Sequence, residues 1–176
     1  MSPIYRHVGE LMRASFFAVP VAVAFNDVIG SPTVVSGRSM QPTLNPHIAP
    51  YAVDNEGLSE GSSDVIWEDK LSIRQNKYDR GSIVVFRSPL KPEERLVKRL
   101  IAVGGDWVRP DEGDKYATLR VPKGYCWVEG DNYGVSEDSN HFGPIPLALI
   151  EAKVTYIIWP PQRIGKLAQG LPSSAR

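Results

Sequence analysis

The sequence predicts a mainly β domain, a compact antiparallel barrel or sandwich, preceded by one N-terminal helix that anchors it to a membrane. Three observations predict this architecture. The chain has 176 residues, 42% of them hydrophobic, which is enough for one domain with its own core. Short β-branched runs separated by Gly and Pro turns follow one another from residue 78 onward. A single uncharged apolar segment lies near the N-terminus.

The N-terminal segment allows three interpretations. Residues 14–26 carry no charge, which is short of the roughly 20 residues of a spanning helix. An uncleaved anchor over about 14–30, with Asp27 near the far interface, is favoured over a buried helix or a removed leader peptide. Arg6 and Arg13 precede the segment, so the positive-inside tendency leaves the N-terminus on the matrix or cytoplasmic side.

The strand-like runs follow in order, each closed by a turn signal. A turn over residues 78–81 precedes the first, a Gly-Gly-Asp turn closes the second, and Pro160-Pro161 stops the last. Such short runs with regular turns are typical of an all-β barrel or sandwich. The predicted strands are Ser82–Phe86, Leu96–Val103, a short one from Trp107, Tyr116–Val121, Tyr125–Glu129 and Ile150–Trp159.

Two stretches are predicted to be peripheral. Residues 54–70 combine six acidic side chains with a Gly/Ser-rich centre, which indicates a flexible solvated loop, with an acidic docking site as the alternative. The tail after Pro161 is polar and is expected to be frayed or a short surface helix. The expected organisation is an N-terminal segment over 1–33, a catalytic domain over 34–161 and a tail over 162–176.

Composition excludes several classes of function. Twenty basic and twenty acidic residues balance, so charge gives no argument for a nucleic-acid partner. The single cysteine, Cys126, excludes an intrachain disulfide and a cysteine-based zinc site, and its apolar neighbours favour a buried thiol. No cofactor and no metal ion are expected.

Ser39 and Lys98 form the candidate catalytic pair. A serine hydroxyl is a poor nucleophile by itself, and a lysine kept neutral by burial can act as its base. The three histidines lie in no triad motif. Gly37 permits unusual backbone angles beside Ser39, and Pro42 restricts the chain beyond it. Taken alone, the composition of this segment favours an ordinary turn that leaves a membrane segment over a catalytic loop.

Periodicity does not decide which cation of the Leu96–Val103 strand is buried. Lys98 and Arg99 lie on opposite faces, and both faces are otherwise apolar. Chemistry distinguishes them, because arginine stays protonated whereas a desolvated lysine can lose its proton. A lysine on a strand is usually an exposed edge residue.

Four segments, in order, resemble the motifs of type I signal peptidases, the serine–lysine proteases that remove leader peptides. They are Ser36–Thr43, Tyr78–Phe86, Leu96–Asp106 and Gly130–Asn140. The resemblance covers roughly residues 34–159. It implies a serine endopeptidase in which Ser39 is the nucleophile and Lys98 the general base. Gly37 and Met40 are the supporting residues beside the nucleophile.

The resemblance also assigns roles in the last motif. Ser136 matches the serine that orients the lysine by a hydrogen bond, and Asp138 matches the acidic residue that props that loop. Two positions depart from the family pattern. Gly37 stands where many bacterial members have an oxyanion-hole serine, so the Ser39 N–H carries more of that work. Asn140 stands where many relatives have arginine.

Within the family, four stretches are most similar to mitochondrial inner membrane members. They are Phe16–Val21, Ser39–Pro42, Ser139–Pro144 and Trp159–Pro161. This likeness implies a single-pass protein of the mitochondrial inner membrane whose catalytic domain faces the intermembrane space. The implied partners are precursor proteins with cleavable presequences, a homologous peptidase subunit in a heterodimer, and membrane lipid through the N-terminal helix, with no nucleic acid.

Two alternatives stay open at this point. One is another enzyme of the same chemistry: a bacterial or plastid signal peptidase, or a self-cleaving serine–lysine repressor. The apolar N-terminal segment and the Ser139–Pro144 stretch argue against the repressor. The other is a non-catalytic β domain that scaffolds a partner subunit.

Overall fold

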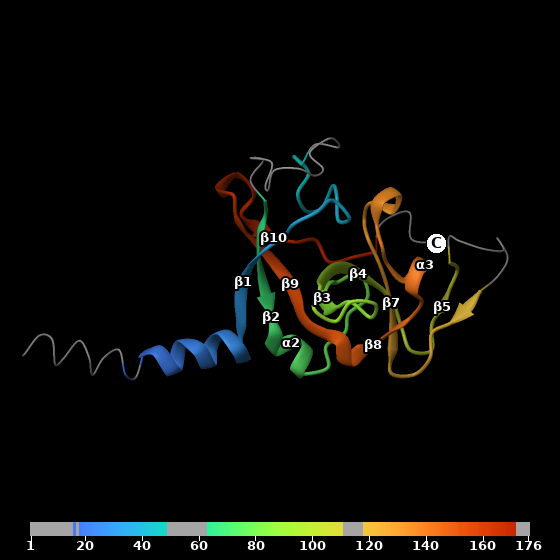
Figure 1. Ribbon diagram of the computed structural model, residues 1–176, viewed down its shortest axis with the longest axis horizontal. Coiled ribbons are helices and arrows are strands. Elements are labelled where there is room, and N and C mark those ends of the chain that lie inside the picture. The colour runs from blue at the N-terminus through green and yellow to red at the C-terminus, as the bar shows by residue number, and fades with distance from the viewer. Residues whose placement is uncertain (1–15, 17, 49–62, 111–117, 172–176) are drawn as a thin grey trace, which may run out of the picture.

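The protein folds around one curled antiparallel sheet, seen in the computed structural model of Figure 1, which describes residues 16, 18–48, 63–110 and 118–171. Seven strands follow the order β1-β2-β9-β3-β4-β7-β8, and β10 pairs with β9. A separate two-stranded sheet joins β5 and β6. The main strands are β1 (Gly30–Val34), β2 (Val65–Asp69), β3 (Ile83–Arg87), β4 (Arg95–Val103), β7 (Tyr125–Glu129) and β9 (Ile150–Trp159).

The remaining elements are short. They are β5 (Trp107–Val108), β6 (Leu119–Arg120), β8 (Ile145–Pro146), β10 (Gly165–Lys166), α2 (Lys70–Arg74), α3 (Ser139–Phe142) and the 3-10 turns η1 (Tyr133–Val135), η2 (Leu147–Leu149) and η3 (Pro161–Arg163). The predicted mainly β class is confirmed. The bounds of β7 and β9 are those predicted, β4 begins one residue before the prediction, and β3 is shifted by one residue at both ends.

Strand β4 is shared between two neighbours along its length. It pairs with β3 over residues 95–99 and with β7 over residues 99–103. Among the strands of the described residues, none pairs with the β7 side of β4 over residues 95–98, immediately before the pairing with β7 begins. Such an unpaired edge can accept a further strand.

The core lies on both faces of the central strands, which explains why periodicity did not separate an inner from an outer face. In β3, Ile83 and Val85 belong to one buried cluster, whereas Val84 and Phe86 belong to another. Cys126 is fully buried in the second cluster, as its apolar neighbours predicted.

The predicted acidic loop over 54–70 is wrong in its last part. Residues 49–62 lie outside the described chain, but Val65–Asp69 is strand β2, paired with both β1 and β9. Asp64 and Glu68 are buried, because each carboxylate has an arginine partner. The acidic residues around Val65-Ile66-Trp67 favoured the loop prediction, although this apolar run is itself typical of a strand.

The segment after Pro161 also differs from the expected surface tail. Gly165–Lys166 pairs with β9, and Leu167 is buried in the core beside Ile83 and Val85. The Gly170 carbonyl accepts a hydrogen bond from Arg99 Nη1 at 3.2 Å. The chain up to about residue 170 is therefore part of the β domain.

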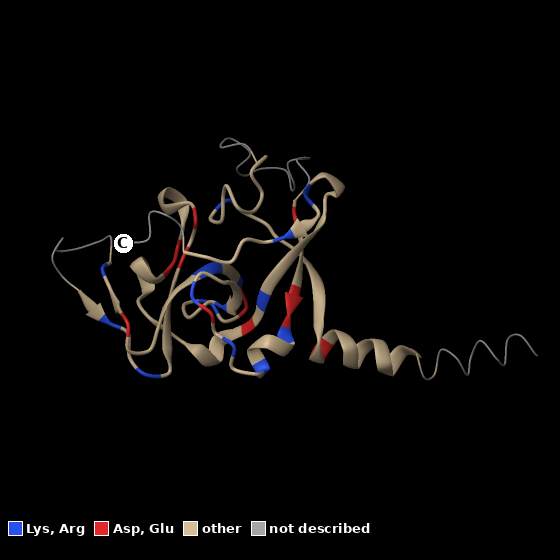
Figure 2. Ribbon diagram, turned by 180° about the vertical axis from the view of Figure 1, so that it is seen from behind, with Lys and Arg blue, Asp and Glu red and all other residues tan. Residues whose placement is uncertain are grey.

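Residues 18–28 form a helix that projects from the start of β1 (Figure 1). Figure 2 shows it without charged residues except near its C-terminal end, where Asp27 lies. Phe25 meets Trp67 of β2 with ring centroids 6.4 Å apart. Within the described residues, no helix has both the length and the apolarity needed to cross a membrane. Residues 14, 15 and 17 of the predicted anchor lie outside the described chain.

Candidate active site

Ser39 and Lys98, 59 positions apart in the chain, meet in the structure. The Lys98 Nζ lies 2.6 Å from Ser39 Oγ, within hydrogen-bonding distance. Lys98 comes from β4, just before that strand begins to pair with β7, and only 3% of the residue is exposed. Lys98 is therefore not the exposed edge residue that a lysine on a strand usually is.

The surroundings of Lys98 favour its neutral form. Burial lowers the pKa of Lys98 from 10.5 to about 8, and the negative charges of Asp138 and Glu137 oppose that shift. Removing a cation from water costs free energy, so the neutral amine gains weight in a dry site. At pH values near 8 a large fraction of Lys98 can then accept a proton.

Arg99, the next residue, is also buried, but with a different partner. Its guanidinium binds Asp131 at two points, with Nε 2.8 Å from Oδ1 and Nη2 2.6 Å from Oδ2. Its Nη1 donates to the Gly81 carbonyl at 2.8 Å. The strand therefore carries one cation with a carboxylate partner and one whose nearest partner is a hydroxyl.

Asn45 holds the loop that carries Ser39. Its Nδ2 donates to the carbonyl oxygens of Val35 and Gly37, at 2.8 and 3.1 Å. Asn45 and Asp64 exchange two further hydrogen bonds between backbone and side chain, each 2.7 Å long. Asn45 has a positive φ of 52°, which asparagine tolerates better than most residues. The serine loop is thus closed on itself and tied to the start of β2.

Arg163 adds a second tie to that loop. Its Nη2 donates to the Thr43 carbonyl at 2.8 Å, and its Nε lies 3.1 Å from Asp64 Oδ1. Met40, beside Ser39, is buried in the core with Val85 and Ile66. Its side chain therefore anchors the serine loop to the core.

The segment after β7 clamps the serine loop from the other side. The Asn132 N–H donates to the Ser39 carbonyl at 3.0 Å, and Asn132 Nδ2 donates to the Arg38 carbonyl at 3.2 Å. A Cβ atom placed on Gly130 would lie 2.5 Å from the Ser39 carbonyl oxygen and 2.3 Å from Ser136 Oγ. The close approach of the two loops therefore requires glycine at position 130.

Asp138 organises the rest of this segment. Its Oδ2 accepts hydrogen bonds from the Gly130 N–H at 2.9 Å and from Ser136 Oγ at 2.6 Å. Its Oδ1 accepts from the backbone N–H and the Nδ2 of Asn140, at 3.1 and 3.0 Å. The neutral side-chain amide of Asn140 therefore binds Asp138 at the position where many relatives have arginine. The Ser136 hydroxyl donates to Asp138, and no hydrogen bond joins it to Lys98 among the described residues.

At Gly37 the sequence predicts that a side-chain donor to the oxyanion is missing. Its φ is +89°, a conformation that favours glycine, and a Cβ atom there would meet nothing within 4 Å. Ser39 and Lys98 lie with Gly37 on the wall of a cavity of about 140 Å³, between the serine loop and residues 95–98 of β4. Because residue 37 has no side chain, open space remains beside Ser39 and Lys98.

The chain belongs to the signal peptidase family, peptidase S26, whose model matches residues 8–117 and 110–159. It is 45% identical to the mitochondrial inner membrane protease subunit 2 of Mus musculus over 91% of this chain and 85% of that protein. It is 37% identical to the subunit 2 of Danio rerio, over 97% of this chain and 87% of that protein. The likeness to this mitochondrial subunit, indicated by four stretches of sequence, is confirmed.

Two more distant relatives extend the comparison. The subunit 2 of Saccharomyces cerevisiae is 35% identical over 86% of this chain and 82% of that protein. A crystal structure of a signal peptidase I from Enterococcus faecalis is 28% identical and superimposes with a TM-score of 0.38, covering 45% of this chain and 97% of that one.

Sequence reasoning missed several residues that build the site. Asp131 and Asn132 belong to the last motif but had no predicted role, Asp64 was assigned to the acidic loop, and no role was predicted for Asn45 and Arg163. The position of Asn132, two residues after Gly130 in that motif, was the available signal. For Arg163 no local pattern distinguishes it from other charges of the C-terminal segment.

Proposed function

We propose that the protein is a membrane-bound serine endopeptidase that removes presequences from precursor proteins, with Ser39 as nucleophile and Lys98 as general base. One observation carries the proposal: a buried lysine amine of lowered pKa lies 2.6 Å from a serine hydroxyl. Membership of the signal peptidase family supports the reaction class.

The proposed reaction is acyl transfer. Neutral Lys98 takes the proton of Ser39 as Oγ attacks the scissile carbonyl carbon. The resulting ammonium then gives that proton to the leaving amine, and an acyl-enzyme remains. Water attacks the ester, Lys98 accepts the proton from the water, and Ser39 recovers it when the acid leaves. The developing oxyanion is thus accompanied by the Lys98 ammonium, and Lys98 returns to its neutral form at the end of each half-reaction.

The oxyanion requires a donor, and we assign that role to the Ser39 N–H. It makes no hydrogen bond to any residue in the described ranges, so it is available. Gly37 supplies no hydroxyl, which makes the backbone donor more important. Removal of one oxyanion donor typically lowers kcat by about 10²- to 10³-fold.

The substrate is proposed to bind as an extended strand. The unpaired edge of β4 over residues 95–98 leads directly to Lys98, and strand addition at such an edge supplies backbone hydrogen bonds without demanding a sequence. The cavity beside this edge measures only about 140 Å³ and includes Val35 and Val97 in its wall. Small apolar side chains on the acyl side of the cut fit this space.

The cellular setting is proposed from the relatives. The names of these relatives describe subunits of a mitochondrial inner membrane protease. We infer the same membrane for this protein, with a single N-terminal anchor, a catalytic domain facing the intermembrane space and a homologous partner subunit.

Precursor processing in membranes tests the proposal. Ser39→Ala and Lys98→Met are each expected to abolish cleavage, while the variant protein still assembles with its partner subunit. Lys98→Arg is expected to be inactive too, because arginine keeps its proton. Processing at wild-type rates by either dyad variant would favour the non-catalytic scaffold instead.

A further inference from the structure

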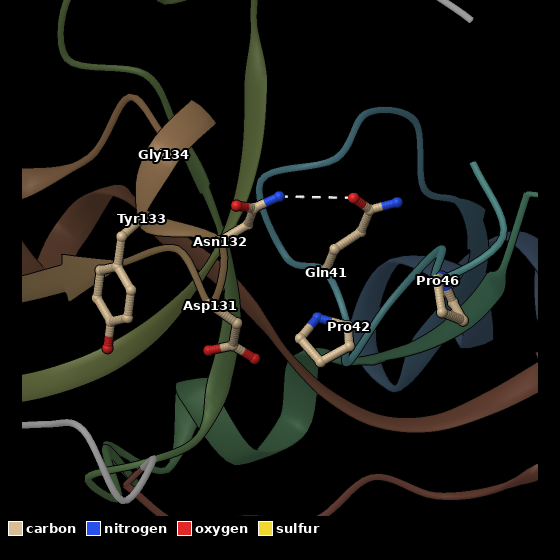
Figure 3. A pocket seen from close by; sticks show the side chains of 7 residues that line it. All are labelled: Gln41, Pro42, Pro46, Asp131, Asn132, Tyr133 and Gly134. Atoms are coloured by element: carbon tan, nitrogen blue, oxygen red, sulfur yellow. Dashed lines mark hydrogen bonds between the residues drawn. The ribbon is translucent and has the colours of Figure 1, made fainter. Parts of the chain in front are cut away.

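A second, open groove is lined by the serine loop beyond Met40 and by the segment after β7, and the mechanism above does not use it. Its volume is about 520 Å³, within the range of peptide- and ligand-binding clefts. Figure 3 shows the Tyr133 ring on one side and Pro42 and Pro46 on the other, with the Asp131 carboxylate between them. Asn132 Nδ2 and Gln41 Oε1 meet at 3.5 Å across one end.

The position of this groove relative to Ser39 and Lys98 indicates which part of a bound peptide would enter it. The serine loop lines both spaces: residues up to Met40 face the small cavity, and residues from Gln41 onward face the open groove. Asn132, in the groove wall, donates to the Ser39 carbonyl at 3.0 Å. An extended chain that occupies the small cavity and crosses Ser39 therefore continues into the open groove.

The residues that line the groove indicate the kind of ligand that it would bind. The polar groups at its base already have partners within the protein: Asp131 is neutralised by Arg99, and Gln41 Nε2 donates to the carbonyls of Asn45 and Ile48. Asn132 Nδ2 likewise donates to the Arg38 carbonyl. The phenol ring and the two proline rings of the lining offer apolar contact without charge. Such a surface suits an extended peptide with an apolar side chain.

We propose that this groove binds the peptide segment on the leaving-amine side of the cut, and so contributes to the choice of cleavage site. The inference rests on the proposed peptidase function. It assigns Tyr133 and Pro42 to substrate binding and to no step of the chemistry.

Gly134 provides a way to block the groove selectively. It lines the groove, its φ lies outside the positive region, and a Cβ atom placed there would meet nothing within 4 Å. Gly134→Leu is therefore expected to fold normally while filling the groove. Tyr133→Ala removes one wall, and Tyr125→Ala is its matched control, since the two tyrosines are 42% and 38% exposed and Tyr125 lies on β7 away from the groove.

Two substrates with the same acyl side separate the possible outcomes. One continues for several residues beyond the cut, and the other ends there in a coumarin amide. Gly134→Leu is expected to lower kcat/KM at least tenfold for the long substrate, mainly through KM, and less than twofold for the short one. Equal losses on both, or a loss on neither, overturn the inference. Failure of the wild type to cleave either substrate contradicts the proposed function itself.

Cross-linking gives a readout that needs no activity. The natural Cys126 is buried, so Tyr133→Cys in a Ser39→Ala background presents one accessible thiol. Precursor peptides carrying a bromoacetyl group downstream of the cut are expected to react with it, and Tyr125→Cys is the control. Reaction only with peptides labelled upstream of the cut would reverse the assigned direction and overturn the proposal.

Discussion

Arg99 binds Asp131 through two charge-assisted hydrogen bonds, one residue along β4 from Lys98. Both side chains are almost fully buried, and Thr43 of the serine loop donates to the same carboxylate. The pair therefore joins the strand of Lys98, the loop of Ser39 and the segment after β7. Two adjacent buried side chains thus differ: Arg99 binds a carboxylate that joins these segments, whereas Lys98 forms no ion pair with a carboxylate among the described residues.

Loss of one member of this pair is expected to destabilise the protein strongly. Arg99→Met or Asp131→Leu leaves an uncompensated buried charge, which costs about 3–5 kcal/mol. Urea unfolding in detergent measures the change in the free energy of unfolding. The double variant Arg99→Met/Asp131→Leu removes both charges and is expected to recover more than half of the loss. Additive losses in the double variant would contradict this account of the pair.

Activity is expected to rise with pH through about 8. Lys98 acts as a base only when neutral, and burial lowers its pKa to about 8, so kcat/KM climbs as pH passes that value. The free energy of unfolding is also expected to rise with pH. The unfolded lysine binds more protons between about pH 8 and 10.5, so Lys98 favours the folded state increasingly over that window. Lys98→Met should remove this component of the pH dependence. A pH profile that is flat from 6 to 9 excludes Lys98 as the base.

Glu137 tunes this midpoint. Its negative charge raises the pKa of Lys98, in opposition to burial. Glu137→Gln should therefore move the midpoint of the kcat/KM profile to lower pH, by a small amount because the residue is exposed to solvent. High salt should shift the wild-type midpoint in the same direction and leave the variant nearly unchanged. A shift to higher pH in the variant contradicts the assignment.

Gly130 is expected to tolerate no side chain. In Gly130→Ala the new methyl group overlaps the Ser39 carbonyl and the Ser136 hydroxyl, so the serine loop must move away from Lys98. A displacement of about 1 Å in an active site can cost about 10²-fold in rate, and a loss of at least that size in kcat is expected. The matched control is Gly170→Ala, where a methyl group meets nothing within 4 Å and near wild-type activity is expected. Comparable activity of the two variants would exclude the close contact.

Asn45 is expected to contribute through both its amide and its backbone. Asn45→Gly keeps the positive φ accessible but removes the hydrogen bonds to Val35, Gly37 and Asp64. Asn45→Ala also incurs the left-handed backbone strain, about 1–2 kcal/mol, and should unfold at lower denaturant than the glycine variant. Equal stabilities of the two variants would rule out the backbone contribution.

The sequence was sufficient for most strands that carry their own signal. Strand β7 is an aromatic and apolar run between Gly124 and Gly130, β9 is rich in β-branched residues and is followed by Pro160, and both have the predicted bounds. The sequence failed for β1 and β10, which have weak local patterns, and for β2, whose apolar run lies among acidic residues. In the structure β1 pairs with β2, and both β2 and β10 pair with β9. Pairing across a sheet depends on distant partners, which a local window does not contain.

The sequence by itself determined the residue types of the site: a serine beside glycine, a lysine in an apolar strand and a motif ending in Asp138 and Asn140. Only the tertiary structure decided what surrounds them. Lys98 and Arg99 have equivalent apolar neighbours along β4, yet one faces a hydroxyl and the other a carboxylate. Likewise, Asp64 and Glu68 look like surface charges until Arg163 and Arg95 approach from distant parts of the chain. Burial and pKa depend on the surrounding dielectric and on nearby charges, and these exist only once the sheet has curled and brought its loops together.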